Sequence, residues 1–304
     1  MPGGRAPGER RRCGALYHRV YYAPVPGDKM IEPPSFPIAA MIQAAVPWRR
    51  IAFVLLASMV ILGAGPSRAQ DIPVVAAAAD LKFALEEIAG AFTQTTGRSV
   101  KLAFGSSGNF RRQIAEGAPF QIYMSADEAF VFAVAKEGRT LDEGTLYAIG
   151  RIVIFVPNGS PLKPDPELRD LAAGIADGRV KKFAIANPEH APYGRAAQQA
   201  LIRAGLWDKI ADRIVLGENV SQAAQFAASG SAQGGIIALS LARAPSVSKL
   251  GQYALLPAES HDPLRQRMVL LKGAGDTAKA FYQFVQQPQA RAIFKHYGFL
   301  LPGE

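Results

Sequence analysis

From residue 73 onward, short apolar runs rich in β-branched residues alternate with stretches whose apolar residues recur at helical spacing. The stretch from Asp80 to Gly97 is typical, because every third or fourth residue between Leu81 and Phe92 is apolar. A terminal helical pair is predicted over residues 277–296, with a break at Pro288. This alternation predicts βαβ units, in which helices cover mostly parallel sheets. Strands are predicted over residues 73–78, 100–104, 121–125, 151–156, 182–186, 214–216 and 235–239.

The alternation stops and starts again near the turn Pro157-Asn158-Gly159, which marks a crossing into a second lobe. Residues 267–271 predict the return crossing. We therefore expect two lobes of similar plan with a ligand held between them. Residues 70–150 with about 262–304 form lobe I, and about 151–261 form lobe II.

The beginning of the chain has the pattern of an export signal. Trp48-Arg49-Arg50 is basic, residues 51–65 are apolar, and Ser67 and Ala69 are small. We predict a signal peptide over residues 41–69 that is cleaved after about Ala69. A transmembrane anchor is the alternative, but this apolar stretch is shorter than the roughly 20 residues needed to span a bilayer. Residues 1–40 have no periodicity, and we interpret them as disordered or as a mis-assigned start.

Composition narrows the class of protein. Hydrophobic residues at 49% and charged residues at 19% are typical of a globular chain. The net charge of +9 suggests nucleic acid, but residues 1–69 hold nine Lys or Arg against three Asp or Glu. No basic stripe remains after that segment is removed, so we expect no nucleic-acid partner. The single cysteine, Cys13, lies in the same segment. A mature chain without a cysteine to form disulfides or carry a lipid is expected to be a soluble periplasmic protein.

Four predicted strand–helix junctions carry the candidate binding residues. Ligands of open α/β sheets lie beyond the carboxyl ends of strands, where helix N-termini offer unpaired N–H groups and a partial positive charge. An oxyanion fits such a place without a basic side chain. Each junction taken singly is equally a turn or a helix cap, but two in each lobe favour a ligand gripped from both sides. The junctions are Ala79-Asp80, Ser106-Ser107, Tyr193-Gly194 and Val220-Ser221.

Catalytic and metal-binding patterns are sparse. The sequence has no HExxH, no GxSxG, no Walker loop and no clustered metal ligands. His190 is expected to serve a structural role in its loop. An exported enzyme using Asp80, Ser107 and Tyr193 as acid, nucleophile and base is the alternative from another class. Because no recognised motif places a histidine beside Ser107, we predict that the protein is not an enzyme.

Six stretches spread over nearly all of residues 71–302 add a further indication. They are VAAAADL (75–81), FGSSGN (104–109), GAPF with SADE (117–128), YAIG (147–150), ANPEHAPYG (186–194) and FKHYGF (294–299). In order and spacing these stretches resemble the periplasmic molybdate-binding proteins of ABC transporters. The resemblance implies the α/β two-lobed type II periplasmic binding protein fold, with the ligand in the interlobe cleft.

The resemblance also implies a function and a site. Molybdate, and also tungstate, would be captured for a membrane permease that is driven by a cytoplasmic ATPase. A monomer is expected, and no cofactor besides the oxyanion itself. Ala238 stands where one branch of the family has a tyrosine ligand, so Tyr193 is expected to be the aromatic contact here. The implied ligand-binding residues are Ala79, Asp80, Ser107, Tyr193 and Val220.

Asp80 departs from this family, which commonly has Ser, or a Thr-Asn pair, at Ala79-Asp80. A carboxylate that faces a dianion is repelled. We therefore expect Asp80 to cap its own helix while N–H groups of Asp80 or Leu81 face the ligand. Such a site has no acceptor for a protonated anion such as hydrogen phosphate. The departure also leaves open a different ligand, either sulfate or a small organic molecule whose ammonium group would pair with Asp80.

Overall fold

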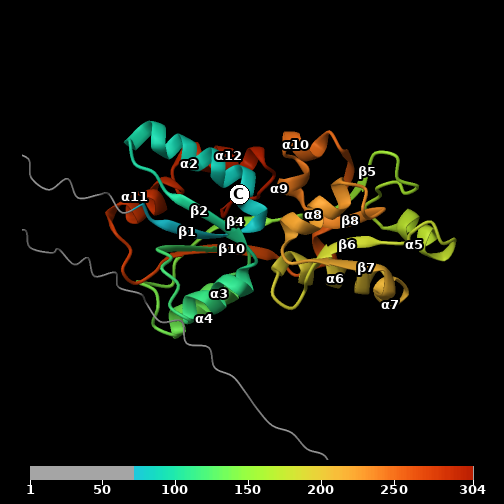
Figure 1. Ribbon diagram of the computed structural model, residues 1–304, viewed down its shortest axis with the longest axis horizontal. Helices are drawn as coiled ribbons and strands as arrows, with labels where there is room; N and C mark the ends of the chain where they lie inside the picture. Colours follow the sequence, from blue (N-terminus) through green and yellow to red (C-terminus); the bar gives the residue numbers. More distant parts are fainter. Residues whose placement is uncertain (1–71, 304) are drawn as a thin grey trace, which may run out of the picture. The chain divides into compact units, whose positions relative to one another are not determined.

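The computed structural model describes residues 72–303. The predicted signal peptide, its cleavage after Ala69 and the segment before it lie outside the described residues. Two five-stranded sheets organise the described part of the chain (Figure 1). Their strands are β1 (Val74–Ala78), β2 (Lys101–Gly105), β3 (Ile122–Ser125), β4 (Thr145–Gly150), β5 (Ile152–Pro157), β6 (Phe183–Ala186), β7 (Ile214–Gly217), β8 (Gly234–Ala238), β9 (Gly251–Leu255) and β10 (Leu264–Leu270).

Helices connect these strands and lie on both faces of the sheets (Figure 1). We call the first sheet with α2, α3, α4, α11 and α12 lobe I, and the second sheet with α5 to α10 lobe II. The helices are η1 (Ala79–Leu81), α2 (Lys82–Thr96), α3 (Ser107–Ala115), α4 (Glu128–Lys136), α5 (Arg169–Ala176), α6 (Pro192–Arg203), α7 (Trp207–Ile210), η2 (Ala211–Arg213), α8 (Val220–Ala228), α9 (Leu239–Ala242), α10 (Pro245–Ser248), η3 (Ala258–Ser260), α11 (Asp276–Phe284) and α12 (Pro288–His296).

The two sheets share one plan. The strand order is β2-β1-β3-β10-β4 in the first sheet and β7-β6-β8-β5-β9 in the second. In the first sheet β1, β2 and β3 pair in parallel, whereas β10 is antiparallel to both β3 and β4. β10 is therefore the one strand of this sheet that runs against the other four, and β5 has the same place in the second sheet. The prediction of mostly parallel sheets is confirmed for strand direction, although half of the pairings are antiparallel.

The reversed strands are also the places where the chain changes sheet. β5 follows β4 after the single residue Arg151, and β10 follows β9 after residues 256–263. The first crossing therefore lies at Arg151, where lobe II is predicted to start, and not at the turn at residues 157–159. The return crossing lies before β10, and not at residues 267–271 as predicted. The turn at residues 157–159 ends β5 inside the second sheet, where Asn158 N–H donates to the carbonyl of Leu250 at 2.9 Å.

Strand β1 shows why lobe I folds as a layered unit. Its residues alternate between two buried clusters, because successive side chains of a strand point to opposite faces. Val75 and Ala77 pack in the cluster that holds Phe92 of α2, whereas Ala76 packs in the cluster that holds Phe110 of α3. Figure 1 accordingly shows α2 and α12 on one side of the first sheet and α3 and α4 on the other. A strand covered on both faces has no polar positions, which is the pattern of β1.

Several elements were not predicted, and their sequences show why. β9 is an edge strand with a mostly exposed face, so its sequence Gly-Gln-Tyr-Ala-Leu has no sustained apolar alternation. The eight-residue helix α5 contains an internal Gly174 and is too short for a clear helical period. The helices α7, α9 and α10 have four residues each and are too short for a helical period; they and β4 were also not predicted.

Candidate functional site

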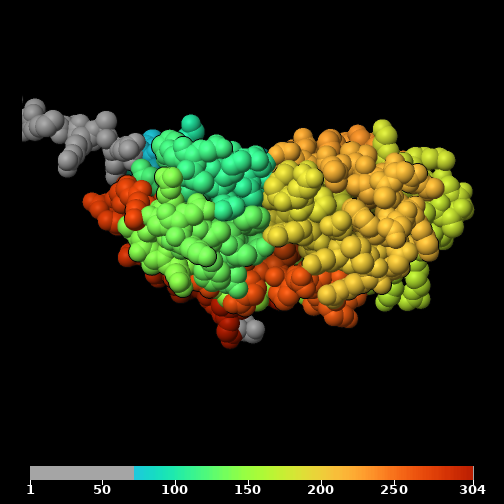
Figure 2. Space-filling model, turned by 90° about the horizontal axis from the view of Figure 1, so that it is seen from below, coloured from blue at the N-terminus to red at the C-terminus, as the bar shows by residue number. Residues whose placement is uncertain are grey.

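Four helix starts, two from each lobe, meet around one small cavity. Its volume is about 10 Å³, so it is close to the minimum that holds a single water molecule. All five residues that the sequence nominates as ligand contacts line it. On the face shown in Figure 2, lobe I residues in green lie against lobe II residues in yellow. The lining residues are Ala78, Ala79, Asp80, Gly105, Ser106, Ser107, Ala126, Ala191, Pro192, Tyr193, Asn219 and Val220.

Strand ends place these helix starts side by side. β1 leads directly into η1, β2 into α3, β6 by a short loop into α6, and β7 by a short loop into α8. The first turn of a helix has backbone N–H groups without intrahelical partners, which give it a partial positive charge. At α8 the Asn219 side chain accepts from the N–H groups of Ser221 (3.0 Å) and Gln222 (3.1 Å). Neither of these two hydrogen bonds uses the N–H of Val220, which is the first residue of α8.

Ser107 is held by hydrogen bonds that leave its hydroxyl proton available. The side chain is fully buried, and its Oγ accepts from the N–H of Ala126 at 3.0 Å. Its carbonyl accepts from the hydroxyl of Tyr123 at 2.7 Å. Because Oγ acts as an acceptor in the contact with Ala126, its O–H bond is free to point at another acceptor. Ser107 therefore fits the role of a neutral donor to a ligand in this cavity.

Asp80 lies at the centre of a buried network that joins the two lobes. Its Oδ2 accepts from Gln266 Nε2 at 2.7 Å and from the hydroxyl of Tyr193 at 3.1 Å. Gln266 Nε2 also lies 3.1 Å from the Tyr193 hydroxyl, and its Oε1 accepts from the hydroxyl of Tyr147 at 2.8 Å. Within residues 72–303, Asp80 Oδ1 has no hydrogen-bond partner.

This network corrects two expectations. The donors to the side chain of Asp80 are Gln266, Tyr193 and its own backbone N–H, and not an N–H of the following turn, so the hypothesis that it caps its own helix is wrong. Gln266 of the same lobe and Tyr193 of the other lobe donate to the carboxylate and hold it instead. The site also contains an acceptor for a protonated anion, contrary to expectation, because the buried Oδ1 is unpartnered.

Burial raises the pKa of Asp80 from 3.8 to about 6. The hydrogen bonds from Gln266 and Tyr193, together with the backbone N–H of Asp80, favour the charged form and oppose the effect of burial. Burial, with the nearby charge of Asp80, also raises the pKa of Tyr193 well above its ordinary value. The carboxyl group of Asp80 is therefore the group in this network that changes its protonation near neutral pH.

A second set of contacts joins the lobes at the rim of the cavity. Ser106 Oγ lies 3.0 Å from His190 Nδ1, and Gly108 N–H donates to the carbonyl of His190 at 2.9 Å. The amide of Asn109 donates to Glu218, whose carboxylate lies 3.6 Å from His190 Nε2. These contacts tie the first turn of α3 to the loops before α6 and α8. His190 thus has the structural role that its position in the sequence suggested.

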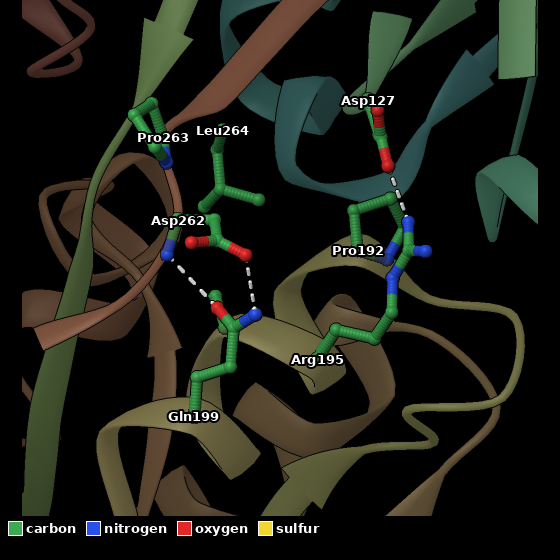
Figure 3. Close-up of a pocket in the computed structure, with 8 residues that line it drawn as sticks. Asp127, Pro192, Arg195, Gln199, Asp262, Pro263 and Leu264 are labelled. Atoms are coloured by element: carbon green, nitrogen blue, oxygen red, sulfur yellow. Dashed lines mark hydrogen bonds and ion pairs between the residues drawn. The ribbon is translucent and has the colours of Figure 1, made fainter. Parts of the chain in front are cut away.

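A larger pocket of about 270 Å³ lies beside the site and is drawn in Figure 3. Its polar groups are already paired with one another. Arg195 forms an ion pair with Asp127, and Gln199 exchanges two hydrogen bonds with Asp262, at 2.6 and 2.9 Å. These contacts join α6 of lobe II to the start of α4 and to the segment before β10. Since the charged groups of this pocket already pair with one another, they are little available to a ligand. We therefore interpret the pocket as part of the lobe boundary.

Sequence reasoning missed the residues that position Asp80. Gln266 occupies an inward position of β10 between Leu264 and Met268, both of which are buried. A glutamine at an inward position of an otherwise apolar alternation was the available signal. Ser240, which donates to the carbonyl of Asp80 at 2.8 Å, lies 160 residues away and gave no signal in the sequence.

Catalytic and membrane features are limited among residues 72–303. No group of three or more His, Cys, Asp or Glu in this range is placed to hold a metal ion. In the same range, no helix has the length and apolar character needed to cross a bilayer. Ser107 has no histidine hydrogen-bonded to its Oγ there, since His190 bonds to Ser106 instead. The arrangement is that of a protein that binds a small ligand between two lobes.

Comparison with known proteins gives the family. Residues 73–300 match the bacterial extracellular solute-binding proteins. The molybdate-binding protein ModA of Rhodobacter capsulatus is 34% identical over 239 residues, which cover 77% of this chain and 90% of that protein. ModA of Azotobacter vinelandii is 33% identical over 256 residues, which cover 82% of this chain and 99% of that protein. The solved structure of the Azotobacter vinelandii periplasmic molybdate-binding protein, 33% identical, has a TM-score of 0.68 and covers 76% of this chain and 100% of its own.

Fold and site together define a two-lobed binding protein of the type II periplasmic plan. The chain belongs to the bacterial extracellular solute-binding proteins. Membership in this family confirms the prediction of a binding protein over an exported enzyme, and it confirms the predicted fold class.

Proposed function

We propose that this protein captures molybdate outside the cytoplasm and delivers it to the permease of an ABC transporter with a cytoplasmic ATPase. The observation that carries the proposal is the meeting of Ala79, Asp80, Ser107, Tyr193 and Val220 around one small cavity. Similarity to the molybdate-binding proteins of two bacteria supports it. Export by the predicted signal peptide, cleaved after about Ala69, would place the protein in the periplasm as a monomer without a cofactor.

The polarity of the cavity supports a small oxyanion. No Lys, Arg or His is among the described residues that line it, so a dianion would be held by neutral donors. The Ser107 hydroxyl and the N–H groups at the starts of η1, α3, α6 and α8 supply such donors. Tungstate, which is nearly equal to molybdate in size and shape, should bind as well.

Entry of the ligand requires the lobes to separate. We propose that they rotate about the two crossings, at Arg151 and near residue 262, which are the limits that the sequence predicts for the lobes. The rim contacts of His190 and Asn109 would break on opening and form again on closure. A ligand held by groups from both lobes stabilises the closed arrangement, since it binds that arrangement better than the open one.

Titration of the exported protein, purified from the periplasm, with molybdate, tungstate, sulfate and phosphate tests the proposal. Isothermal calorimetry should show one molybdate or tungstate per chain and a rise in melting temperature with ligand concentration. Sulfate is smaller and would leave donors unpaired, so its binding should be weaker. Absence of binding for all four anions, or a preference for sulfate over molybdate, would contradict the proposal.

Substitution of Ser107 tests the site. Ser107→Ala removes one hydrogen bond to a charged ligand, worth about 1.5–3 kcal/mol, and should weaken molybdate binding about 10- to 100-fold. Ser229→Ala removes an exposed hydroxyl near the end of α8 and serves as the matched control, with unchanged affinity. Equal affinities of the two variants would exclude Ser107 from the site.

A further inference from the structure

Asp80 is a buried carboxyl group with one satisfied and one unsatisfied oxygen. The residue is 1% exposed and lines the cavity. Oδ2 accepts from Gln266 and Tyr193, whereas Oδ1 has no partner among the described residues. Buried polar atoms in proteins are nearly always hydrogen-bonded, so the partner of Oδ1 is to be sought in what occupies the cavity.

The elements packed around Asp80 bring no unpaired positive charge to it. Arg265 and Arg267 of β10 pair with Glu128, and Arg195 of α6 pairs with Asp127. α8 and α9 contain no charged residue, and Lys82 of α2 pairs with Glu86 at 3.8 Å. Lys101 is exposed at the start of β2, the end opposite to the one that lines the cavity.

The titratable groups nearest to Asp80 are Tyr193 of α6 and Tyr147 of β4. Burial and the charge of Asp80 raise the pKa of both phenols well above the ordinary value, so both stay neutral. Gln266 of β10 and Ser240 of α9 contribute only neutral dipoles. An ionised Asp80 would therefore meet a bound dianion without any compensating cation.

We propose that the oxyanion binds together with one proton, which lies between Asp80 Oδ1 and an oxygen of the anion. This inference rests on the proposed function, because it concerns the same cavity and the same ligand class. Two unprotonated acceptors facing each other repel, whereas a proton between them makes a hydrogen bond. The proton comes from the solvent or its buffer acid: an O–H bond forms on Asp80, and the buffer acid loses its proton. No other bond is made or broken.

Burial favours protonation of the Asp80 carboxylate when the anion binds. It brings the pKa of the carboxyl to about 6 before any anion is present, and the negative charge of a bound dianion raises the pKa further. At neutral pH the free protein therefore carries mostly ionised Asp80, and the complex carries the neutral acid. Binding must then take up one proton, and the affinity must fall about tenfold for each pH unit above about 6 until the pKa of the complex is reached.

Calorimetry of the full exported protein with sodium molybdate tests the inference. Titrations at about pH 7.5, in two buffers with different ionisation enthalpies, measure the number of protons taken up per anion. The expected number is close to one, and the dissociation constant should rise about tenfold per unit from about pH 6.5 to 8.5.

The substitution Asp80→Asn removes the proton uptake while it keeps the hydrogen-bond geometry around Oδ2. Asparagine keeps the oxygen that accepts from Gln266 and Tyr193, and it replaces Oδ1 with an NH₂ group that donates at every pH. This variant should bind molybdate without proton uptake and without pH dependence, and more tightly than the natural protein at about pH 8.5. Asp208→Asn, which neutralises an exposed carboxylate on α7, is the matched control and should keep both the uptake and the pH dependence.

The outcomes separate the two proposals. Tight molybdate binding with no proton uptake and a flat pH profile in the natural protein would overturn the inference and leave the proposed function intact. No molybdate binding at any pH, in the natural protein or in Asp80→Asn, would overturn the proposed function itself. Equal proton uptake in the natural protein and in Asp80→Asn would show that another group takes up the proton, and would also overturn the inference.

Discussion

Replacing Asp80 by asparagine should stabilise the protein at neutral pH and leave it unchanged in acid. Burial raises the pKa of Asp80 from 3.8 to about 6, which makes ionisation in the folded state unfavourable by about 3 kcal/mol. Compared with the unfolded chain, the folded protein therefore favours the protonated form of Asp80. Its contribution to stability is complete below about pH 4, and it is lost as the pH rises through about 6, above which the difference stays constant.

Thermal unfolding, followed by circular dichroism in buffers free of oxyanions, measures the effect. Asparagine preserves the acceptor for Gln266 and Tyr193 and never ionises. At about pH 8 the variant should be more stable by about 3 kcal/mol, which corresponds to a melting temperature about 6–12 °C higher for a domain of this size. At about pH 4 the two proteins should melt within about 1 °C of each other.

The pH dependence of the difference is the decisive readout. A difference in melting temperature that is constant from about pH 4 to 8 would show that Asp80 does not change protonation over this range. A variant less stable than the natural protein at about pH 8 would show that the ionised carboxylate is stabilised in the fold. Asp208→Asn, in which the substituted carboxylate is exposed, should show neither behaviour.

Three further substitutions test how packing and charge stabilise the fold. Gly150→Ala should destabilise the protein by about 1–3 kcal/mol in a thermal unfolding experiment, because a Cβ there would overlap the Tyr193 hydroxyl. Gly90→Ala, at an exposed interior position of α2 with nothing within 4 Å, should stabilise it by about 0.5–1 kcal/mol. Arg195→Ala should cost less than about 1 kcal/mol by chemical denaturation, since its ion pair with Asp127 is partly exposed, and added salt should shrink the difference. A large, salt-independent loss would contradict that reasoning.

Local pattern was sufficient to predict the layers of this protein and the residues around its cavity. The apolar run of β1, the helical spacing of α2 and the Gly-Ser-Ser-Gly sequence at the start of α3 depend on neighbours in the chain. Helix N-termini attract anions because of backbone geometry, so each junction could be identified without knowing its partners in space. The motif resemblance supplied molybdate as the expected ligand and nominated Ala79, Ser107 and Val220.

The state of Asp80 was decided by tertiary structure alone. A sequence places an acidic residue at a helix start and predicts a cap, because capping needs only atoms a few residues away. Here the competing donors come from Tyr193, 113 residues away, and Gln266, 186 residues away, and the fold brings both to one carboxylate oxygen. Burial, which depends on both lobes together, then sets the pKa and leaves Oδ1 without a partner. Hydrogen bonds and desolvation at such a point depend on three-dimensional packing, which local sequence pattern does not encode.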